Sequence, residues 1–131
     1  PKTMKSIILD NCDAISDKGV KKLANIDTLQ KLSLGGTTIN RLTENIRIHL
    51  TNLTTGCPLV TDVSLLVVVQ SCIKLNDLAL NNNPNITSAS LIAMSKHAKN
   101  LTSLDLSGCV CINSGIRELL MHCPLSTVRL Y

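Results

Sequence analysis

The chain has 131 residues, a length that suits one domain, and a formal net charge of +4. It is 44% hydrophobic and 17% charged, which excludes an intrinsically disordered segment. Tyr131 is its one aromatic residue, and its lysine clusters at residues 18–22 and 96–99 lie among acidic residues, so a nucleic-acid partner is not expected.

One pattern recurs in chain order: a hydrophobic residue, two residues, a second hydrophobic residue, one residue, and a third. Its copies begin at Met4, Leu29, Leu50, Leu75, Leu101 and Leu125, the copies at 4, 50 and 125 being weaker. The intervals of 25, 21, 25, 26 and 24 residues indicate a repeat array.

The remainder of each unit repeats as well. Three residues after the last hydrophobic position come Cys12, Thr37, Pro58, Asn83 and Cys109. Small polar residues that suit helix N-caps follow, namely Ser16, Asn40, Thr61, Thr87 and Asn113. Aliphatic residues at helical spacing come next, so each unit is predicted to form a strand, a turn and a helix. The second unit, which begins at Leu29, is short at 21 residues, and over its residues 41–49 we expect one helical turn or an irregular loop.

The stretch Leu-Thr-Ser-Leu-Asp-Leu-Ser-Gly-Cys at residues 101–109, followed by Ile112, resembles the cysteine-containing leucine-rich repeats of F-box/leucine-rich-repeat proteins. Residues 9–20 match nearly as well. The resemblance implies an α/β solenoid with a curved parallel sheet on its concave side and helices on its convex side. We therefore predict one leucine-rich-repeat domain over residues 1–131, with five full units and a partial sixth. No F-box is visible, because the repeats begin by residue 4.

The six cysteines are expected to be free thiols. Cys12 and Cys109 fall in different units and are too far apart for a disulfide. A zinc site is not expected either, because its candidate ligands are split between the two ends of one helix, about 15 Å apart. These candidates are Cys109, Cys111, His122 and Cys123. Free thiols indicate a reducing compartment, the cytoplasm or the nucleus. No secretory signal or membrane span is predicted, since the apolar run at residues 63–69 is far below the about 20 residues required.

No cofactor site and no catalytic constellation is predicted, so an enzyme is not expected. His49, His97 and His122 fall in different units, without a nucleophile at a recognisable spacing. The resemblance implies protein binding, as partner or substrate recognition in a ubiquitin-ligase-like complex. Two alternatives stay open: an intracellular adaptor or inhibitor without a ubiquitin link, and an extracellular receptor fragment, which glycans on Asn52, Asn85 or Asn100 would favour.

Binding to another protein is expected on the concave face, through side chains between the pattern hydrophobics. Those predicted are Lys5, Ile8, Asp10, Lys31, Ser33, Asn52, Thr54, Asp77, Ala79, Ser103, Asp105, Thr127 and Arg129. The last unit has a strand and no helix, so we expect its open edge at residues 126–131 to be covered by further repeats or by another chain.

Overall fold

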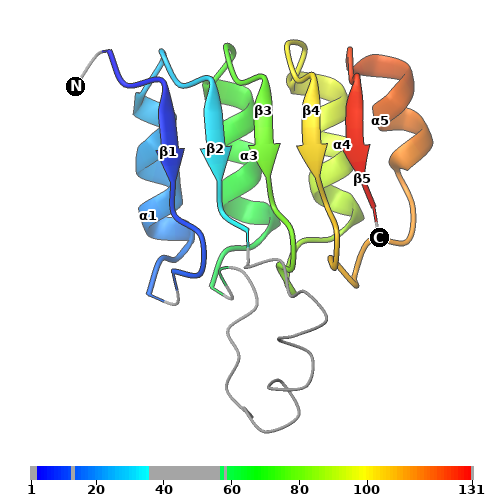
Figure 1. Ribbon diagram of the computed structural model, residues 1–131, viewed down its shortest axis with the longest axis horizontal. Coiled ribbons are helices and arrows are strands. Elements are labelled where there is room, and N and C mark those ends of the chain that lie inside the picture. Colours follow the sequence, from blue (N-terminus) through cyan, green and yellow to red (C-terminus); the bar gives the residue numbers. More distant parts are fainter. Residues whose placement is uncertain (1–2, 13, 36–56, 58, 131) are drawn as a thin grey trace, which may run out of the picture.

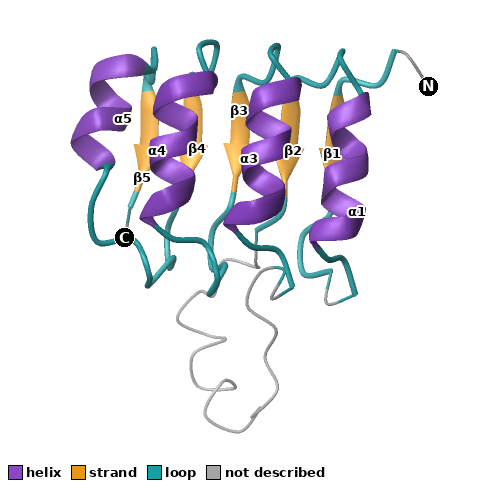
Figure 2. Cartoon of the chain, turned by 180° about the vertical axis from the view of Figure 1, so that it is seen from behind, coloured by secondary structure: helices purple, strands orange, loops and turns teal. Residues whose placement is uncertain are grey.

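The computed structural model describes residues 3–12, 14–35, 57 and 59–130. These residues form two layers, a parallel sheet and a row of helices behind it (Figures 1 and 2). The strands are β1 (Ser6–Ile8), β2 (Lys31–Ser33), β3 (Asp77–Ala79), β4 (Ser103–Asp105) and β5 (Thr127–Arg129). The helices are α1 (Asp17–Lys22), continued by the 3₁₀ turn η1 (Leu23–Asn25), then α3 (Asp62–Ser71), α4 (Ser88–His97) and α5 (Ile116–His122).

The strands lie side by side in chain order, β1-β2-β3-β4-β5, all parallel. Leu32 pairs with Ile7 on one side and with Leu78 on the other, and the same row continues through Leu104 to Val128. A parallel pair needs a crossover connection, which the helices supply. The expected α/β solenoid is therefore confirmed.

One predicted strand is not found where the repeat spacing put it. Among the described residues β2 pairs directly with β3, so no strand from the unit expected at residue 50 lies between them. Residues 36–56, which include the strand pattern of that unit at 50–55 and the turn or loop expected over 41–49, lie outside the described residues. The described sheet therefore has five strands rather than six, and the strand patterns beginning at Leu29 and Leu75 are neighbours in space. The weak copy at residue 50 fitted the period with Thr55 in place of its third hydrophobic residue.

The core lies between the sheet and the helices. Three units place all three pattern leucines there, each at most 3% exposed: Leu29, Leu32 and Leu34; Leu75, Leu78 and Leu80; Leu101, Leu104 and Leu106. Burying one such side chain contributes about 1.5–3 kcal/mol. Their equivalents at the two ends of the array, Ile7 and Val128, are half-buried because each has a neighbouring strand on one side.

A row of cysteine and asparagine side chains connects successive units at the turn after each strand. Cys57 donates from Sγ to the carbonyl of Leu9 (3.3 Å), and Cys109 donates to the carbonyl of Leu80 (3.0 Å). Asn83 serves the intervening unit by donating to the carbonyl of Leu34 (2.8 Å). These contacts satisfy backbone groups that the turn leaves without a ladder partner. Cys57 makes this contact in the unit where the repeat spacing pointed to Pro58; Pro58 and Thr37 both lie outside the described residues.

A second row connects the helix N-termini. Thr61 and Thr87 are the N-caps of α3 and α4 and accept from the backbone N–H two residues on. The Thr61 N–H and hydroxyl donate to Asp17, and those of Thr87 donate to Asp62, so each acid fixes the next helix in the array. The N-cap predicted at Asn113 is wrong: α5 begins after Gly115, whose φ of 89° suits a residue without a side chain.

Candidate protein-binding face

The outer surface of the sheet consists of two rows of side chains. Because strand residues alternate between the two faces, the residues on either side of each central core position point away from the helices. The first row is Ser6, Lys31, Asp77, Ser103 and Thr127, and the second row is Ile8, Ser33, Ala79, Asp105 and Arg129. We call these ten residues the open sheet face, since none of the described helices covers it (Figure 1).

Most of the predicted contact residues lie on this face. The structure brings together Ile8, Lys31, Ser33, Asp77, Ala79, Ser103, Asp105, Thr127 and Arg129. Asn52 and Thr54 lie outside the described residues. That any of these residues contacts a partner stays a prediction.

The register corrects the first unit. Ser6 pairs with Lys31, so Ser6 rather than Lys5 belongs to the first row, and Lys5 precedes the strand. Lys5 and Ser6 stand between Met4 and Ile7. Ser6 directly precedes Ile7, just as Lys31 directly precedes the core leucine of its own strand. Counting from the central hydrophobic position would have identified Ser6 from the sequence.

Asp10 lies past the end of β1 and supports the neighbouring strand. Its carboxylate accepts hydrogen bonds from the hydroxyl of Ser33 and from the backbone N–H of Gly35, the latter at 3.1 Å. This carboxylate therefore holds the end of β2 in place beside the open sheet face. Asp10 itself belongs to neither row.

The charged residues of the face form two ion pairs between neighbouring strands. Lys31 Nζ lies 3.7 Å from Asp77 Oδ2, and an Arg129 guanidinium nitrogen lies 3.8 Å from Asp105 Oδ2. Across β2 to β5 the order is positive, negative, negative, positive. Exposed pairs of this kind add about 0–1 kcal/mol to stability, so these side chains can exchange partners at little cost.

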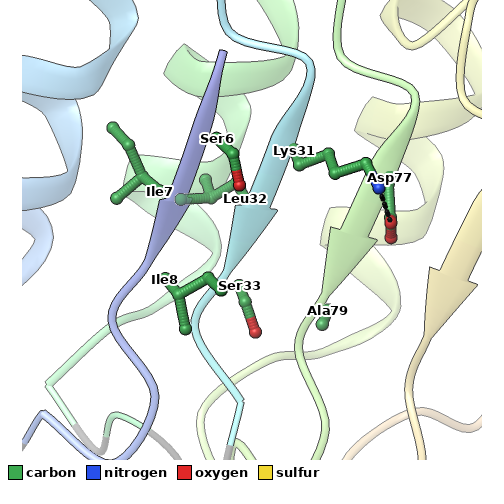
Figure 3. A pocket seen from close by; sticks show the side chains of 8 residues that line it. All are labelled: Ser6, Ile7, Ile8, Lys31, Leu32, Ser33, Asp77 and Ala79. Carbon is green, nitrogen blue, oxygen red and sulfur yellow. Dashed lines mark ion pairs between the residues drawn. The ribbon is translucent and has the colours of Figure 1, made fainter. Parts of the chain in front are cut away.

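A shallow pocket of about 260 Å³ opens at the β1–β3 end of the face. Figure 3 shows Ile8 on β1, with the short side chains of Ser33 and Ala79 on the next two strands and the Lys31–Asp77 pair beside them. Ile8 is 72% exposed. The pocket has room for an apolar side chain of a partner against Ile8, next to a cation and an anion.

The buried thiols are structural donors rather than nucleophiles. All six cysteines are free. Burial raises the pKa of the Cys72, Cys109 and Cys123 thiols, which keeps them protonated at neutral pH. Cys72 donates to the carbonyl of Leu23 (3.5 Å), and Cys123 donates to that of Met94 (3.3 Å).

The two described histidines lie on different helices. His97 and His122 lie in the last turns of α4 and α5, as predicted, and His49 lies outside the described residues. His122 Nδ1 lies 2.8 Å from the carbonyl oxygen of Glu118 in its own helix. In the described part of the chain, no group of three or more His, Cys, Asp or Glu residues is arranged to hold a metal ion.

Comparison with known proteins supports the repeat architecture. A family model described as "Leucine Rich repeat" matches residues 1–24 and residues 97–121. The first stretch holds β1 and α1, and the second holds β4 and most of α5. No curated protein gives a significant match. Within the described ranges, no helix has the length and apolar content needed to cross a membrane.

Proposed function

We propose that this chain, an α/β leucine-rich-repeat solenoid, is a protein-binding scaffold and not an enzyme, and that its open sheet face contacts the partner. The observation that carries this proposal is the contrast between the two sides of the sheet. The helices cover one side, whereas the other presents a continuous surface of ten residues with a pocket beside Ile8. Leucine-rich-repeat domains generally serve as scaffolds for protein–protein interaction.

The chemistry of the face indicates the partner surface that would fit it. A partner with a basic group opposite Asp77 and Asp105, and acidic groups on either side opposite Lys31 and Arg129, would complement the charge order. Trp, Tyr and Arg are the residues that most often dominate binding energy, and Arg129 is the face's one member of that set. We therefore expect moderate affinity, with specificity set largely by charge.

For the finer role, we propose partner or substrate recognition in a ubiquitin-ligase-like complex. The support is the resemblance to the cysteine-containing repeats of F-box/leucine-rich-repeat proteins, which rests on residues 101–109 with Cys109 and on residues 9–20 with Cys12. An adaptor or inhibitor without a ubiquitin link is the competing role. The identity of a captured partner distinguishes the two.

We also propose a reducing compartment, the cytoplasm or nucleus, because six free thiols persist best there. The extracellular alternative predicts glycans. Asn85 and Asn100 are both exposed, although the Asn100 side chain already donates to the carbonyl of Ile73 (2.7 Å). Intact-mass measurement of the native protein decides the point, since a hexose-containing mass increment would overturn the intracellular proposal.

The outer edge of β5 forms a further part of the proposed partner surface. In the described residues β5 pairs with β4 alone, and Leu130 beside it is 50% exposed over a hollow of about 140 Å³ against Cys109, Ile112 and Ile116. We propose that further repeats or another chain cover this edge, because an uncovered parallel edge leaves N–H and C=O groups without partners.

The experiment compares affinity capture from reduced lysate by the wild type and by a charge-swapped variant, Lys31→Glu with Asp77→Lys and Arg129→Glu. The swap retains the possibility of an ion pair between β2 and β3, removes the Arg129–Asp105 pair, and changes the charge order across β2 to β5 to negative, positive, negative, negative. Lys18→Glu, on the exposed side of α1, changes the net charge by the same amount and serves as the control. A partner retained by wild type and control but lost by the swapped variant supports the proposal; equal capture by all three contradicts it.

A further inference from the structure

A groove on the opposite side of the molecule lies between α4 and α5. Its volume is about 400 Å³, against about 260 Å³ for the pocket on the open sheet face. Figure 2, which views the molecule from its helical side, shows the two helices as neighbours in front of the sheet. Its lining residues are Ile92, Ser95, Lys96, Lys99, Glu118 and His122.

The charges around the groove favour an anionic ligand. Lys96 is exposed, and its ammonium has no partner among the described residues. The ammonium of Lys99 donates to the carbonyl of Ser95 at 2.8 Å, which fixes that charge at the wall of the groove. Glu118 is the one acidic side chain in the lining. The two ammonium groups therefore exceed the single carboxylate, and one of them is unpaired.

Ile92 supplies the apolar side chain of the groove, and an exposed leucine occupies the equivalent position on the next helix. Ile92 is 45% exposed, and Leu66 on α3 is 40% exposed. Leu66 precedes Ile92 by 26 residues, the separation between the equivalent helix C-caps Cys72 and Ala98, so the two side chains occupy equivalent positions on neighbouring helices. A ligand could thus bury an apolar side chain on Ile92 while its acidic groups reach the lysines.

We propose that this groove binds an acidic amphipathic segment of another protein, with an aliphatic side chain against Ile92 and carboxylates paired with Lys96 and Lys99. A nucleic acid fits less well, because Glu118 would face its continuous phosphate charge and the lining has no aromatic side chain on which bases could stack. The proposal does not depend on the open sheet face, and it gives the chain a second contact surface on its helical side.

The test is fluorescence anisotropy with the full chain and a defined labelled peptide of about 15 residues, with leucines at helical spacing and glutamates between them. Two further probes are the same peptide with serine in place of leucine and a thymidine oligonucleotide. We expect the leucine–glutamate peptide to bind the wild type more tightly than either of the other probes.

Two variants and a control locate the binding. Lys96→Glu and Ile92→Ser should each weaken peptide binding by about tenfold, because one replaces attraction with repulsion and the other removes the apolar contact. Lys18→Glu on α1 has the same charge change as Lys96→Glu and should bind as the wild type does. The changed side chains are exposed, and thermal unfolding checks that the variants stay folded. The proposal is overturned if the peptide does not bind, if neither groove variant weakens it, or if the oligonucleotide or serine peptide binds as tightly.

Discussion

The side-chain oxygen of Asn83 lies 2.8 Å from the backbone nitrogen of Cys57 and accepts its hydrogen bond. The nitrogen of the same amide donates to the carbonyls of Leu34 and Leu80, each at 2.8 Å. Asn83 is fully buried, so no solvent replaces these contacts. One side chain therefore connects its own turn to the preceding strand and to the turn that leads into α3.

Replacing Asn83 with leucine should destabilise the fold by roughly 2–4 kcal/mol, because a buried N–H and a buried carbonyl would lose their partner. Asn83→Cys should cost less than Asn83→Leu, since Cys57 and Cys109 occupy the same position and their thiols donate to the equivalent carbonyls. Urea unfolding measures both. Equal losses for the two variants would contradict the role given to this hydrogen-bonding row.

The carboxylate of Asp62 holds the start of α4. It accepts from the backbone N–H of Thr87 (2.9 Å), from the Thr87 hydroxyl and from the hydroxyl of Ser90. Asp62→Ala should cost about 1–2 kcal/mol, the range found when a helix loses a capping contact. Asp27→Ala, at an exposed position outside the helices, is the control and should change the unfolding free energy by less than about 0.5 kcal/mol.

Asp17 gives the stability a defined pH dependence. Burial acts to raise the pKa of this carboxyl, but hydrogen bonds from Ser64 and Thr61 together lower it below its ordinary 3.8. A group whose pKa is depressed in the folded state stabilises the fold above its unfolded value, and that contribution is lost as the pH falls through the folded pKa. Unfolding free energies should therefore show the advantage of wild type over Asp17→Asn shrinking from about pH 5 toward about pH 3. A constant difference across that range would contradict the assignment.

Thiol reactivity should separate the exposed cysteine from the buried ones. Cys111 is exposed, whereas Cys57, Cys72, Cys109 and Cys123 are buried. Iodoacetamide at neutral pH, followed by mass spectrometry, should modify Cys111 first and reach the buried four only in denaturant. Inaccessibility protects all four, and the raised thiol pKa of Cys72, Cys109 and Cys123 adds to it. Modification of Cys109 as rapid as that of Cys111 in the folded protein would contradict the described packing.

The strong copies of the repeat were predictable because one physical rule determines them. The leucines at 75, 78 and 80, and those at 101, 104 and 106, pack in successive identical layers, so their spacing in sequence reports their neighbours in space. The rule failed between β2 and β3, since spacing alone cannot distinguish an added layer from an insertion of similar length. It also failed at α5, where the turn continues past Asn113 to a left-handed glycine.

The candidate face was predictable to the extent that strand alternation fixes it. Nine of its ten residues follow from the pattern. The tenth is Ser6, the residue next to Ile7, whereas the prediction took Lys5, the other of the two residues between Met4 and Ile7. The pocket beside Ile8 was not predictable, because it depends on which short side chains lie opposite one another across three strands. The α4–α5 groove likewise depends on how two helices pack.

The most direct test of the central claim places a photocrosslinking residue, p-benzoylphenylalanine, at one position on each side of the sheet. Ser103 on β4 reports on the open sheet face, and Val63, 56% exposed on α3, reports on a part of the helical side that does not line the α4–α5 groove. Each protein is irradiated with the partner that the wild type captures. The account predicts a crosslinked product from position 103 and none from position 63. A product from position 63 alone would contradict the assignment of binding to the open sheet face.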